Sequence, residues 1–268
     1  MTQQPTSFAL SNRDQLVASA SDMVLVPVGA CEQHGPHLPT GTDFMLVSEI
    51  AERAARRLAV DARVLVTPTL PFGYSRHHLP FGATISVTAA TLERFLTDIC
   101  ESIVTVGFQQ IFLINGHGGN ADIVNVVARE VALTQGVRVG AGSYWTMAWD
   151  SLVRAEAHSR NRLPGHAGAF ETSLLMALWP DLVAPEKPHR DGEFNSPAAG
   201  FHGAYLSEDH RNWARINGYS DSPDRATADN GRRWLEATIA GVATALRAFQ
   251  AGAAGPGMAP DRRPDIHD

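Results

Sequence analysis

Cysteine is scarce in this chain, which has only Cys31 and Cys100 among its 268 residues. Two cysteines are too few for the disulfide framework of a small secreted domain, and they fit a reducing compartment. The sequence also has no run of about 18 apolar residues, the length that a membrane-spanning helix needs. Its first residues, MTQQPTSFALSNRDQ, have neither the basic start nor the apolar segment of a secretory signal. We therefore expect a cytoplasmic protein without a membrane partner.

Positive charge is also in short supply, because 22 Lys and Arg stand against 28 Asp and Glu, for a net charge of −6. A protein that binds a phosphate backbone needs a basic patch, and no basic cluster occurs here, so we expect no nucleic-acid partner. With 44% hydrophobic and 19% charged residues, the chain has a globular composition. We expect a single domain over residues 1–250, followed by a disordered tail at 251–268.

Short apolar runs alternate with helical patterns along the chain, which predicts an α/β fold. The expected strands are Met23–Val28, Arg63–Thr67, Gln110–Asn115 and Val137–Tyr144. The expected helices are Phe44–Leu58, one capped by Thr91 and running through Val106, Ala121–Thr134, a segment Gly165–Trp179 that opens with a small-residue turn, and Asn230–Gln250. The strands are too apolar for one face to meet water, so the prediction is a three-layer sandwich with a mostly parallel central sheet flanked by helices. The loop-rich segment between residues 183 and 229 is interpreted as a site rim or a subunit contact.

Polar and aromatic side chains follow the end of every expected strand. In chain order they are Glu32 and His34, then Ser75, His77 and His78, then His117, and finally Tyr144 and Trp145. Open α/β sheets bind ligands beyond the carboxyl ends of their strands, so these groups are expected at one rim. Taken singly, each has a structural alternative: Asp43 fits a helix N-terminus, His117 a hydrogen-bonded turn, and Glu171 the first turn of a helix.

The convergence of two carboxylates and two imidazoles changes that interpretation. Buried charges from different loops would remain unpaired unless a cation lies among them, so the pattern predicts a metal site. Ligands from His, Asp and Glu without a thiolate favour Zn²⁺, Mn²⁺ or Fe²⁺, and the share of carboxylates allows two ions bridged by one Asp. Such a pair of ions generates a hydroxide that attacks a polarised carbonyl.

Four blocks of sequence resemble one known family, the creatininase family of creatinine amidohydrolase-like proteins. They are GACEQHGPHLPTGTD at 29–43, NGHGGN at 115–120, GHAGAFETS at 165–173 and GYSDSPDRATADNGRR at 218–233. The resemblance covers about residues 20–248, and the first block is highly specific. It implies a creatininase-like fold, a metal-dependent hydrolase that cleaves the C–N bond of a small cyclic or linear amide, and a homohexamer.

The resemblance also implies roles for individual residues. Glu32, Asp43 and His117 would bind one metal ion, and His34, the bridging Asp43 and a further carboxylate would bind the second. The family's namesake enzyme continues its turn as H-Y-E-N, with an acid two residues after the histidine, whereas this chain has Gly119 at that position. Glu171 is the candidate for the missing ligand and for a catalytic role. His166 matches the family's catalytic imidazole, which passes a proton to the leaving nitrogen.

The second loop departs from the family pattern S-x-E-H-x-x-F-P-G-T. His78 keeps its place, but His77 replaces the acid, and Gly82-Ala83 replaces Pro-Gly. The loop is therefore expected to shape a different pocket, which disfavours creatinine as the substrate. Deformylation and the maturation of small peptides, both known in the family, remain alternatives. The predicted substrate-binding residues are Ser75, His78, Tyr144 and Trp145, although Trp145 also fits a core position.

Three rival interpretations compete with the metallohydrolase. Gly116-x-Gly118-x-x-Ala121 fits a dinucleotide fingerprint, but the next strand ends without the acid that such a site needs. Cys31 as a nucleophile, with Glu32 or His34 as its base, would give a metal-free amidase. A metal that only stabilises a binding protein is the third rival, and it predicts that the metal-loaded chain hydrolyses no amide.

Overall fold

A four-stranded parallel sheet forms the centre of the chain. The computed structural model describes residues 7–59, 63–158, 163–190 and 210–252, so most of the predicted tail and much of the predicted rim lie outside the described residues. The strands are β1 (Met23–Val28), β2 (Val64–Val66), β3 (Gln110–Asn115) and β4 (Arg138–Ser143). Their order is β2-β1-β3-β4, and every neighbouring pair is parallel. The predicted α/β class is confirmed.

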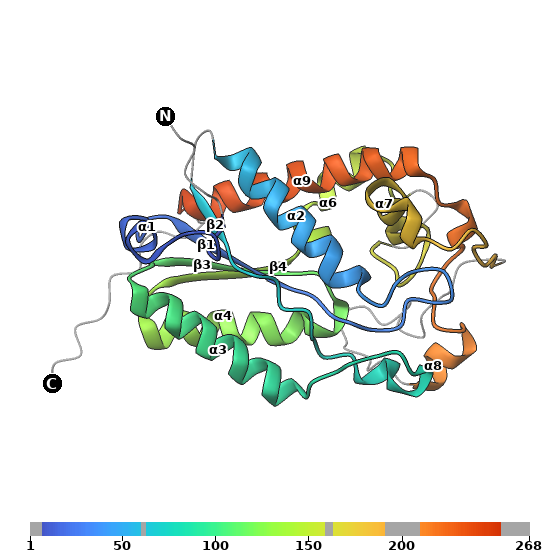
Figure 1. Cartoon of the computed structure of the whole chain (residues 1–268), viewed down its shortest axis with the longest axis horizontal. Helices are drawn as coiled ribbons and strands as arrows, with labels where there is room; N and C mark the ends of the chain where they lie inside the picture. The colour runs from blue at the N-terminus through green and yellow to red at the C-terminus, as the bar shows by residue number, and fades with distance from the viewer. Residues whose placement is uncertain (1–6, 60–62, 159–162, 191–209, 253–268) are drawn as a thin grey trace, which may run out of the picture.

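Long helices cover both faces of this sheet, as Figure 1 shows. One face carries α2 (Thr42–Leu58), α7 (Ala169–Leu178) and α9 (Ala228–Gln250), and the other carries α3 (Ala89–Val106) and α4 (Ala121–Gln135). Alternate residues of β1 enter opposite cores: Met23 and Leu25 pack toward α2 and α9, while Val24 and Val26 pack toward α3 and α4. The strand is therefore apolar at every position because neither face meets water.

Shorter elements lie in the connections. They are α1 (Arg13–Ala18), α5 (Tyr144–Met147), α6 (Trp149–Arg154) and α8 (His210–Arg215), with 3₁₀ turns η1 (Arg76–Phe81), η2 (Gly118–Asn120), η3 (Pro180–Leu182) and η4 (Pro223–Arg225). The predicted cap of one helix is wrong, and α2 and α9 begin two residues before their predicted starts. Helix α3 begins at Ala89 because Thr88, not Thr91, is its cap and accepts a hydrogen bond from the Thr91 backbone nitrogen (3.1 Å). Helix α7 begins at Ala169, after the predicted small-residue turn, in which Gly165 and Ala167 have left-handed φ values of 69° and 48°.

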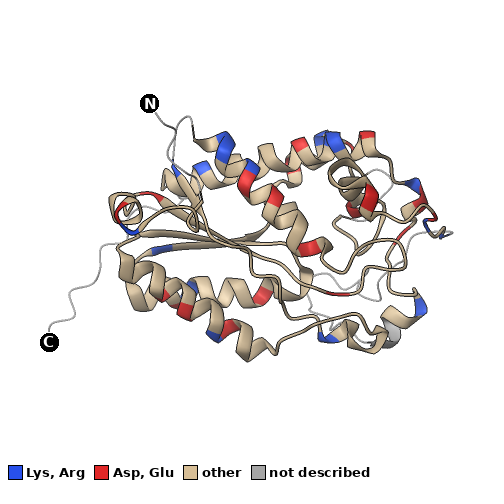
Figure 2. Cartoon of the chain, in the orientation of Figure 1, with Lys and Arg blue, Asp and Glu red and all other residues tan. Residues whose placement is uncertain are grey.

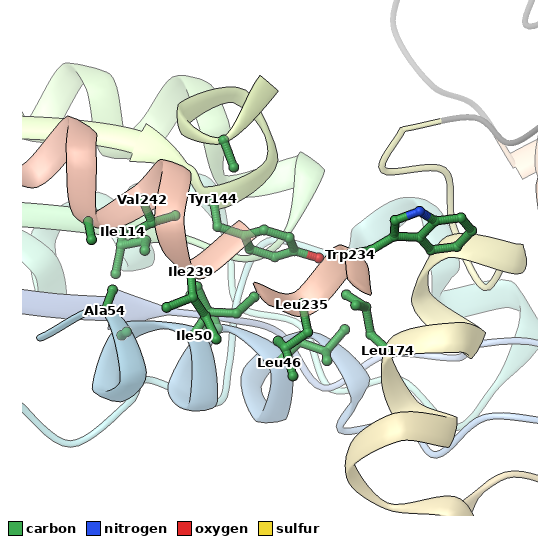
Figure 3. Close-up of a cluster of buried hydrophobic side chains, with 14 of the residues drawn as sticks. Leu46, Ile50, Ala54, Ile114, Tyr144, Leu174, Trp234, Leu235, Ile239 and Val242 are labelled. Atoms are coloured by element: carbon green, nitrogen blue, oxygen red, sulfur yellow. The ribbon is translucent and has the colours of Figure 1, made fainter. Parts of the chain in front are cut away.

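The larger core lies between the sheet and helices α2, α7 and α9. Figure 3 shows Leu46 and Ile50 of α2 facing Leu235 and Ile239 of α9. All four side chains are at most 5% exposed. Burial of a leucine or isoleucine contributes about 1.5–3 kcal/mol, so this layer holds α2 firmly against the sheet. The position of Asp43, in the first turn of α2, is fixed by the same packing.

Charged residues of both signs are interspersed along the outer helices (Figure 2). On α2, Arg53 pairs with Glu49 (2.6 Å) and Arg56 with Glu52 (3.3 Å), both at i,i+4 spacing. Such pairs each contribute only a few tenths of a kcal/mol. Within the described part of the chain, none of the helices combines the length and the apolar character that crossing a bilayer requires.

The strand ends meet at one edge of the sheet. The last residue of β1, Val28, pairs with Asn115 of β3, which in turn pairs with Ser143 of β4. Because β1 lies between β2 and β3, the connections that leave β1 and β3 diverge to opposite sides of the sheet. This switch point is where open α/β sheets place their ligand sites.

Candidate metal centre

The segment that follows β1 carries the first two acidic and imidazole groups into the interior. The backbone nitrogen of Glu32 donates to the Thr40 carbonyl (2.9 Å), which closes the loop around them. His34 Nδ1 lies 3.1 Å from the carbonyl oxygen of Glu32. The side chains of Glu32 and His34 are fully buried, and Asp43 enters the same space from the first turn of α2.

The NGHGGN turn after β3 is built to hold His117. The Asn115 amide nitrogen donates to the His117 carbonyl (2.7 Å), and the Asn115 amide oxygen accepts from the His117 backbone nitrogen (3.1 Å). Asn120 joins this turn to the other two loops, because it accepts from the Tyr74 backbone nitrogen (2.9 Å) and donates to the Gly29 carbonyl (3.0 Å). Both asparagines are fully buried. The turn is therefore a scaffold in which side chains replace regular backbone pairing.

The four residues expected to share metal ions lie together. His117 Nδ1 is 3.2 Å from Glu32 Oε1 and 3.1 Å from Asp43 Oδ2. His34 Nε2 is 3.2 Å from Asp43 Oδ1, so Asp43 lies between the two imidazoles and faces each with a different oxygen. That arrangement suits a carboxylate that bridges two ions.

The GHAGAFETS segment adds two more groups to this cluster. Glu171 Oε2 lies 3.8 Å from His34 Nε2 and accepts a hydrogen bond from the Ala167 backbone nitrogen (2.7 Å). His166 Nδ1 lies 3.4 Å from Glu32 Oε1. The backbone of His166 is held by Ser220 through two hydrogen bonds, one from each residue to the other (2.8 and 2.9 Å).

A backbone carbonyl fixes the tautomer of each of three histidines. A carbonyl oxygen only accepts hydrogen bonds, so the nearby ring nitrogen must carry the proton. The pairs are His34 Nδ1 with the Glu32 carbonyl (3.1 Å), His117 Nε2 with the Tyr74 carbonyl (3.0 Å) and His166 Nε2 with the Gln33 carbonyl (2.9 Å). In each neutral ring the other nitrogen then presents a lone pair toward the carboxylates. Metal-ligating histidines are oriented in this way.

The electrostatics of the cluster favour a cation. Burial opposes charge on the His34 ring, but the carboxylates of Asp43, Glu171 and Glu32 raise its pKa to about 10. Burial, reinforced by the charges of Asp43 and Glu32, raises the pKa of Glu171 to about 8. Protons therefore occupy these groups in the metal-free protein, and the binding of a divalent ion would release them.

Unpaired atoms show that these residues fit a metal. Among the described residues, both carboxylate oxygens of Glu32, Asp43 Oδ2 and His34 Nε2 are buried without a well-directed hydrogen bond, although imidazole and carboxylate groups of the cluster approach three of these atoms to 3.1–3.2 Å. Leaving such groups unpaired is costly, and coordination to a cation would satisfy all of them. Three sets have ligand atoms that all lie within 4.8 Å of one another: His34, Asp43 and Glu171; Glu32, His34 and His166; and Glu32, His77 and His117. The donor set of oxygen and imidazole nitrogen suits Zn²⁺, Mn²⁺ or Fe²⁺.

Gly119 leaves no space for the acid that the family's namesake enzyme carries there. A Cβ at this position would collide with the Tyr74 carbonyl oxygen and would lie 2.6 Å from His117 Nε2. The Tyr74 carbonyl is the group that orients His117, so neither neighbour can move without disturbing that ring. The space favours Glu171 as the source of the further carboxylate.

Gly119→Glu is expected to lower the free energy of unfolding by about 1–3 kcal/mol, because the added side chain overpacks a buried turn. It should also lower metal content, because the orientation of His117 is lost. Gly118→Glu is the matched control, since a Cβ at Gly118 meets nothing within 4 Å. Urea unfolding and metal analysis of both variants check this. Unchanged stability with full metal content in Gly119→Glu would contradict the steric argument.

The predicted substrate-binding residues fall into two groups. Ser75 lies behind His117, with its Oγ 3.3 Å from His117 Nε2, and His78 Nε2 lies 3.6 Å from Glu32 Oε1. Tyr144 is buried in the larger core, and Trp145 packs edge-on against its ring with a centroid distance of 5.0 Å. Burial and the charges of Glu171 and Asp43 raise the pKa of the Tyr144 hydroxyl well above 10. The structure thus brings Ser75 and His78 to the cluster and places Trp145 against the core.

Gln33 and Trp213 each contact two histidines of the site, and neither carries a role in the sequence prediction. The amide nitrogen of Gln33 lies 3.0 Å from both His78 Nδ1 and His166 Nε2. Trp213 of α8 packs edge-on against the same two rings, with centroid distances of 4.6 and 5.0 Å. The only sequence signal for Gln33 is its position between Glu32 and His34. Trp213 had none, because it lies in the loop-rich segment.

Cys31 is half-buried, and its contacts are those of a packing residue and not of a nucleophile. Its Sγ lies 3.7 Å from the Thr40 hydroxyl oxygen, and its backbone carbonyl accepts from Ile85 (2.9 Å). The contact with Ile85 joins the loop after β1 to the second loop. These contacts support the interpretation of Cys31 as a small packing residue.

Comparison with known proteins identifies the family to which the chain is similar. The family model for creatininase, described as creatinine amidohydrolase, matches residues 11–246. The chain is 31% identical over 249 residues to a creatinine amidohydrolase of Pseudomonas putida, with 86% of this chain and 91% of the relative covered. It is 35% identical over 185 residues to a mycofactocin precursor peptide peptidase of Mycolicibacterium smegmatis, with 68% of each covered.

A solved structure of creatininase with Mn matches with a TM-score of 0.75 and 28% identity, covering 91% of this chain and 98% of that chain. Further relatives are named as an inosose hydrolase of Thermotoga maritima and a ribosylaminopyrimidine deformylase of Methanothermus fervidus. These matches favour the hydrolase over the nucleotide-binding alternative. The chain belongs to the creatininase family of hydrolases.

Proposed function

We propose that this protein is a metal-dependent amidohydrolase that cleaves the C–N bond of a small amide. The observation that carries the proposal is the buried meeting of Glu32, Asp43, His34 and His117, whose unpaired oxygens and nitrogen converge. Membership of a family that contains creatinine amidohydrolases supports the reaction class. A core does not bury three acids together for stability alone, because removing charged groups from water is unfavourable even where imidazoles lie beside them.

Two ions would be held by overlapping sets of ligands. Glu32, Asp43 and His117 would hold one, and His34, Asp43 and Glu171 would hold the other, with Asp43 common to both. Divalent ions in such a centre polarise a carbonyl oxygen and lower the pKa of water, which makes it a nucleophile at neutral pH. The Mn form of the solved creatininase supports a divalent ion of the kind that the donor set favours.

His166 would move the proton. Burial and the neighbouring His34, His78 and His117 hold its pKa well below 6.5, so the ring is neutral. Its Nδ1 lone pair faces the carboxylates, where it can accept a proton from the attacking water. When the C–N bond breaks and its electron pair moves to nitrogen, Nδ1 returns this proton to the leaving group. The carbonyl of Gln33 keeps the ring in the required orientation throughout.

The substrate class is narrowed by the departures from creatininase. Gly119 replaces an acid next to the centre, and His77 replaces the acid of the second loop. A small amide other than creatinine, cyclic or linear, is therefore the proposed substrate. Peptide maturation is the second candidate, because a peptidase of mycofactocin precursor is 35% identical over 68% of the chain.

The experiment that tests the function joins metal analysis to a substrate screen. Purified enzyme is loaded separately with Zn²⁺, Mn²⁺ or Fe²⁺ and incubated with cyclic amides, formamides and C-terminal dipeptides. Hydrolysis of one class that depends on added metal supports the proposal and selects the substrate. Metal-loaded protein that cleaves none of them would favour the rival in which the metal only stabilises a binding protein.

Alkylation of thiols is expected to leave hydrolysis intact, whereas a chelator should abolish it. Burial raises the pKa of the Cys100 thiol to about 12, so at pH 8 only the half-buried Cys31 should react in the folded protein. Mass spectrometry counts the alkylated sites, and the same sample is assayed. Loss of activity in step with alkylation of Cys31, with no effect of chelator, would support the cysteine amidase instead.

We also propose that the chain assembles into a homohexamer, on the basis of its resemblance to the family. Light scattering at micromolar concentration is expected to give a mass about six times that of the 28.9 kDa chain. A monomeric mass under these conditions would rule the assembly out.

A further inference from the structure

The side-chain amide of Gln33 has an orientation that two backbone groups determine. The Gly35 backbone nitrogen lies 3.0 Å from one end of the amide and can only donate, so that end is the oxygen, Oε1. The Gly218 carbonyl lies 3.0 Å from the other end and can only accept, so that end is the nitrogen, Nε2. The polarity of this amide therefore follows from heavy-atom positions alone.

Gln33 in turn determines the tautomer of His78. Gln33 Nε2 lies 3.0 Å from His78 Nδ1, and because an amide nitrogen only donates, His78 Nδ1 must accept. A ring nitrogen that accepts carries a lone pair, so the ring is neutral and its single proton is on Nε2.

Unlike His78, His166 faces the centre with its unprotonated nitrogen. Its Nε2 is equally close to Gln33 Nε2 (3.0 Å), but it also lies 2.9 Å from the Gln33 backbone carbonyl, which can only accept. His166 Nε2 therefore carries the proton, and the two amide hydrogens of Gln33 go to His78 and to the Gly218 carbonyl. The two histidines thus differ in what they present to the centre: His166 offers a lone pair, and His78 offers an N–H.

The N–H of His78 is directed at the reacting region and held there. His78 is fully buried, and its Nε2 lies 3.6 Å from Glu32 Oε1, beyond hydrogen-bond distance. Among the described residues this nitrogen has no hydrogen-bond partner. The ring lies between His166, stacked at a centroid distance of 4.3 Å, and the edge of Trp213 at 4.6 Å, so it cannot turn to find a partner elsewhere.

We propose that His78 is a catalytic hydrogen-bond donor whose Nε2–H binds the carbonyl oxygen of the substrate, and that Gln33 is the positioning residue that keeps the proton on that nitrogen. The inference rests on the proposed amide hydrolysis. As water adds to the carbonyl carbon, a C–O bond forms and the π electron pair moves to the carbonyl oxygen, where the His78 N–H stabilises the negative charge. His78 keeps its proton, while His166 carries the transferred one. A donor of this kind typically contributes about 10²–10³-fold to kcat.

The tautomer is tested without any variant. Long-range ¹⁵N–¹H NMR of the metal-free and the Zn²⁺-loaded enzyme distinguishes a ring protonated on Nε2 from one protonated on Nδ1. We expect His78 to be neutral with its proton on Nε2 in both forms, and Gln33→Met to give a mixture of tautomers. Gln109→Met, on an exposed glutamine, is the control. A His78 ring protonated on Nδ1, or coordinated through Nε2, in the wild-type enzyme would overturn the inference.

Kinetics test the role of the donor. His78→Phe keeps the ring without a donor and should lower kcat about 10²–10³-fold with metal content unchanged, whereas His78→Gln, which restores an N–H, should recover part of the loss. Gln33→Met should cost about 10–100-fold, the usual effect of a residue that orients another. If wild type hydrolyses its amide and His78→Phe keeps full kcat, this inference alone fails. If wild type binds no metal and hydrolyses nothing, the proposed function fails, and the NMR result still tests the tautomer.

Discussion

Replacing Asp43 with asparagine is expected to remove bound metal and hydrolysis together. Asp43 faces His34 with one oxygen and His117 with the other (3.2 and 3.1 Å), so a neutral amide weakens both proposed metal positions at once. Metal ions stabilise the transition states of hydrolysis by several kcal/mol, so kcat/KM should fall at least about 10²-fold. Metal analysis after dialysis, with the assay on the same sample, measures both effects.

Asp122→Asn is the control for this substitution. Asp122 lies in the first turn of α4, as Asp43 lies in the first turn of α2, but it is exposed. Both substitutions remove the same favourable interaction with a helix dipole, about 0.3–1 kcal/mol, and only one touches the centre. If Asp43→Asn kept wild-type metal content and turnover, Asp43 would be a helix-terminal acid and nothing more.

Replacing His166 with asparagine is expected to lower kcat about 10²–10⁴-fold while the metal stays bound. Asparagine cannot accept and return a proton, and general acid–base catalysis contributes this much to rate. Because the Gln33 carbonyl keeps the proton on Nε2, Nδ1 is the atom that would accept and return the transferred proton. Steady-state kinetics and metal analysis separate proton transfer from coordination.

The exposed His158 provides the matched control, as His158→Asn should leave kcat unchanged. Loss of metal from His166→Asn would show that His166 is a ligand, in agreement with its distance from Glu32 and His34. Unchanged kcat with full metal would remove it from the mechanism.

The fold could be predicted from the sequence where burial on both faces allows only one kind of element. Strands β1 and β3 have the predicted bounds because both are buried on two faces, which requires an unbroken apolar run. The end of α3 at Gly107 and of α4 at Gly136 followed from the left-handed conformation that glycine adopts easily. The cap of α3 was missed because Thr88 and Thr91 are both of a residue type that caps helices, and only the structure shows that Thr88 accepts from the Thr91 backbone nitrogen.

The meeting of the proposed metal ligands could be predicted from the sequence, but the residues that support them could not. Glu32, His34 and His117 follow strands that end side by side, so topology alone brings them together. The contacts of Gln33 reach residues 45, 133 and 185 positions away, and no local pattern encodes them. Trp213 packs against His78 and His166, and it carried no sequence signal because it lies in the loop-rich segment. Trp145, in contrast, lies in α5 and packs against the core.

The proposed function requires acids and imidazoles from separate loops to share divalent ions. Equilibrium dialysis against Mn²⁺ or Zn²⁺, followed by metal analysis of the wild-type protein, counts the bound ions. We expect about two tightly bound ions per chain, with amide hydrolysis that disappears when they are stripped and returns when they are restored. A protein that hydrolyses its substrate at full rate with far less than one ion per chain would contradict the proposed function.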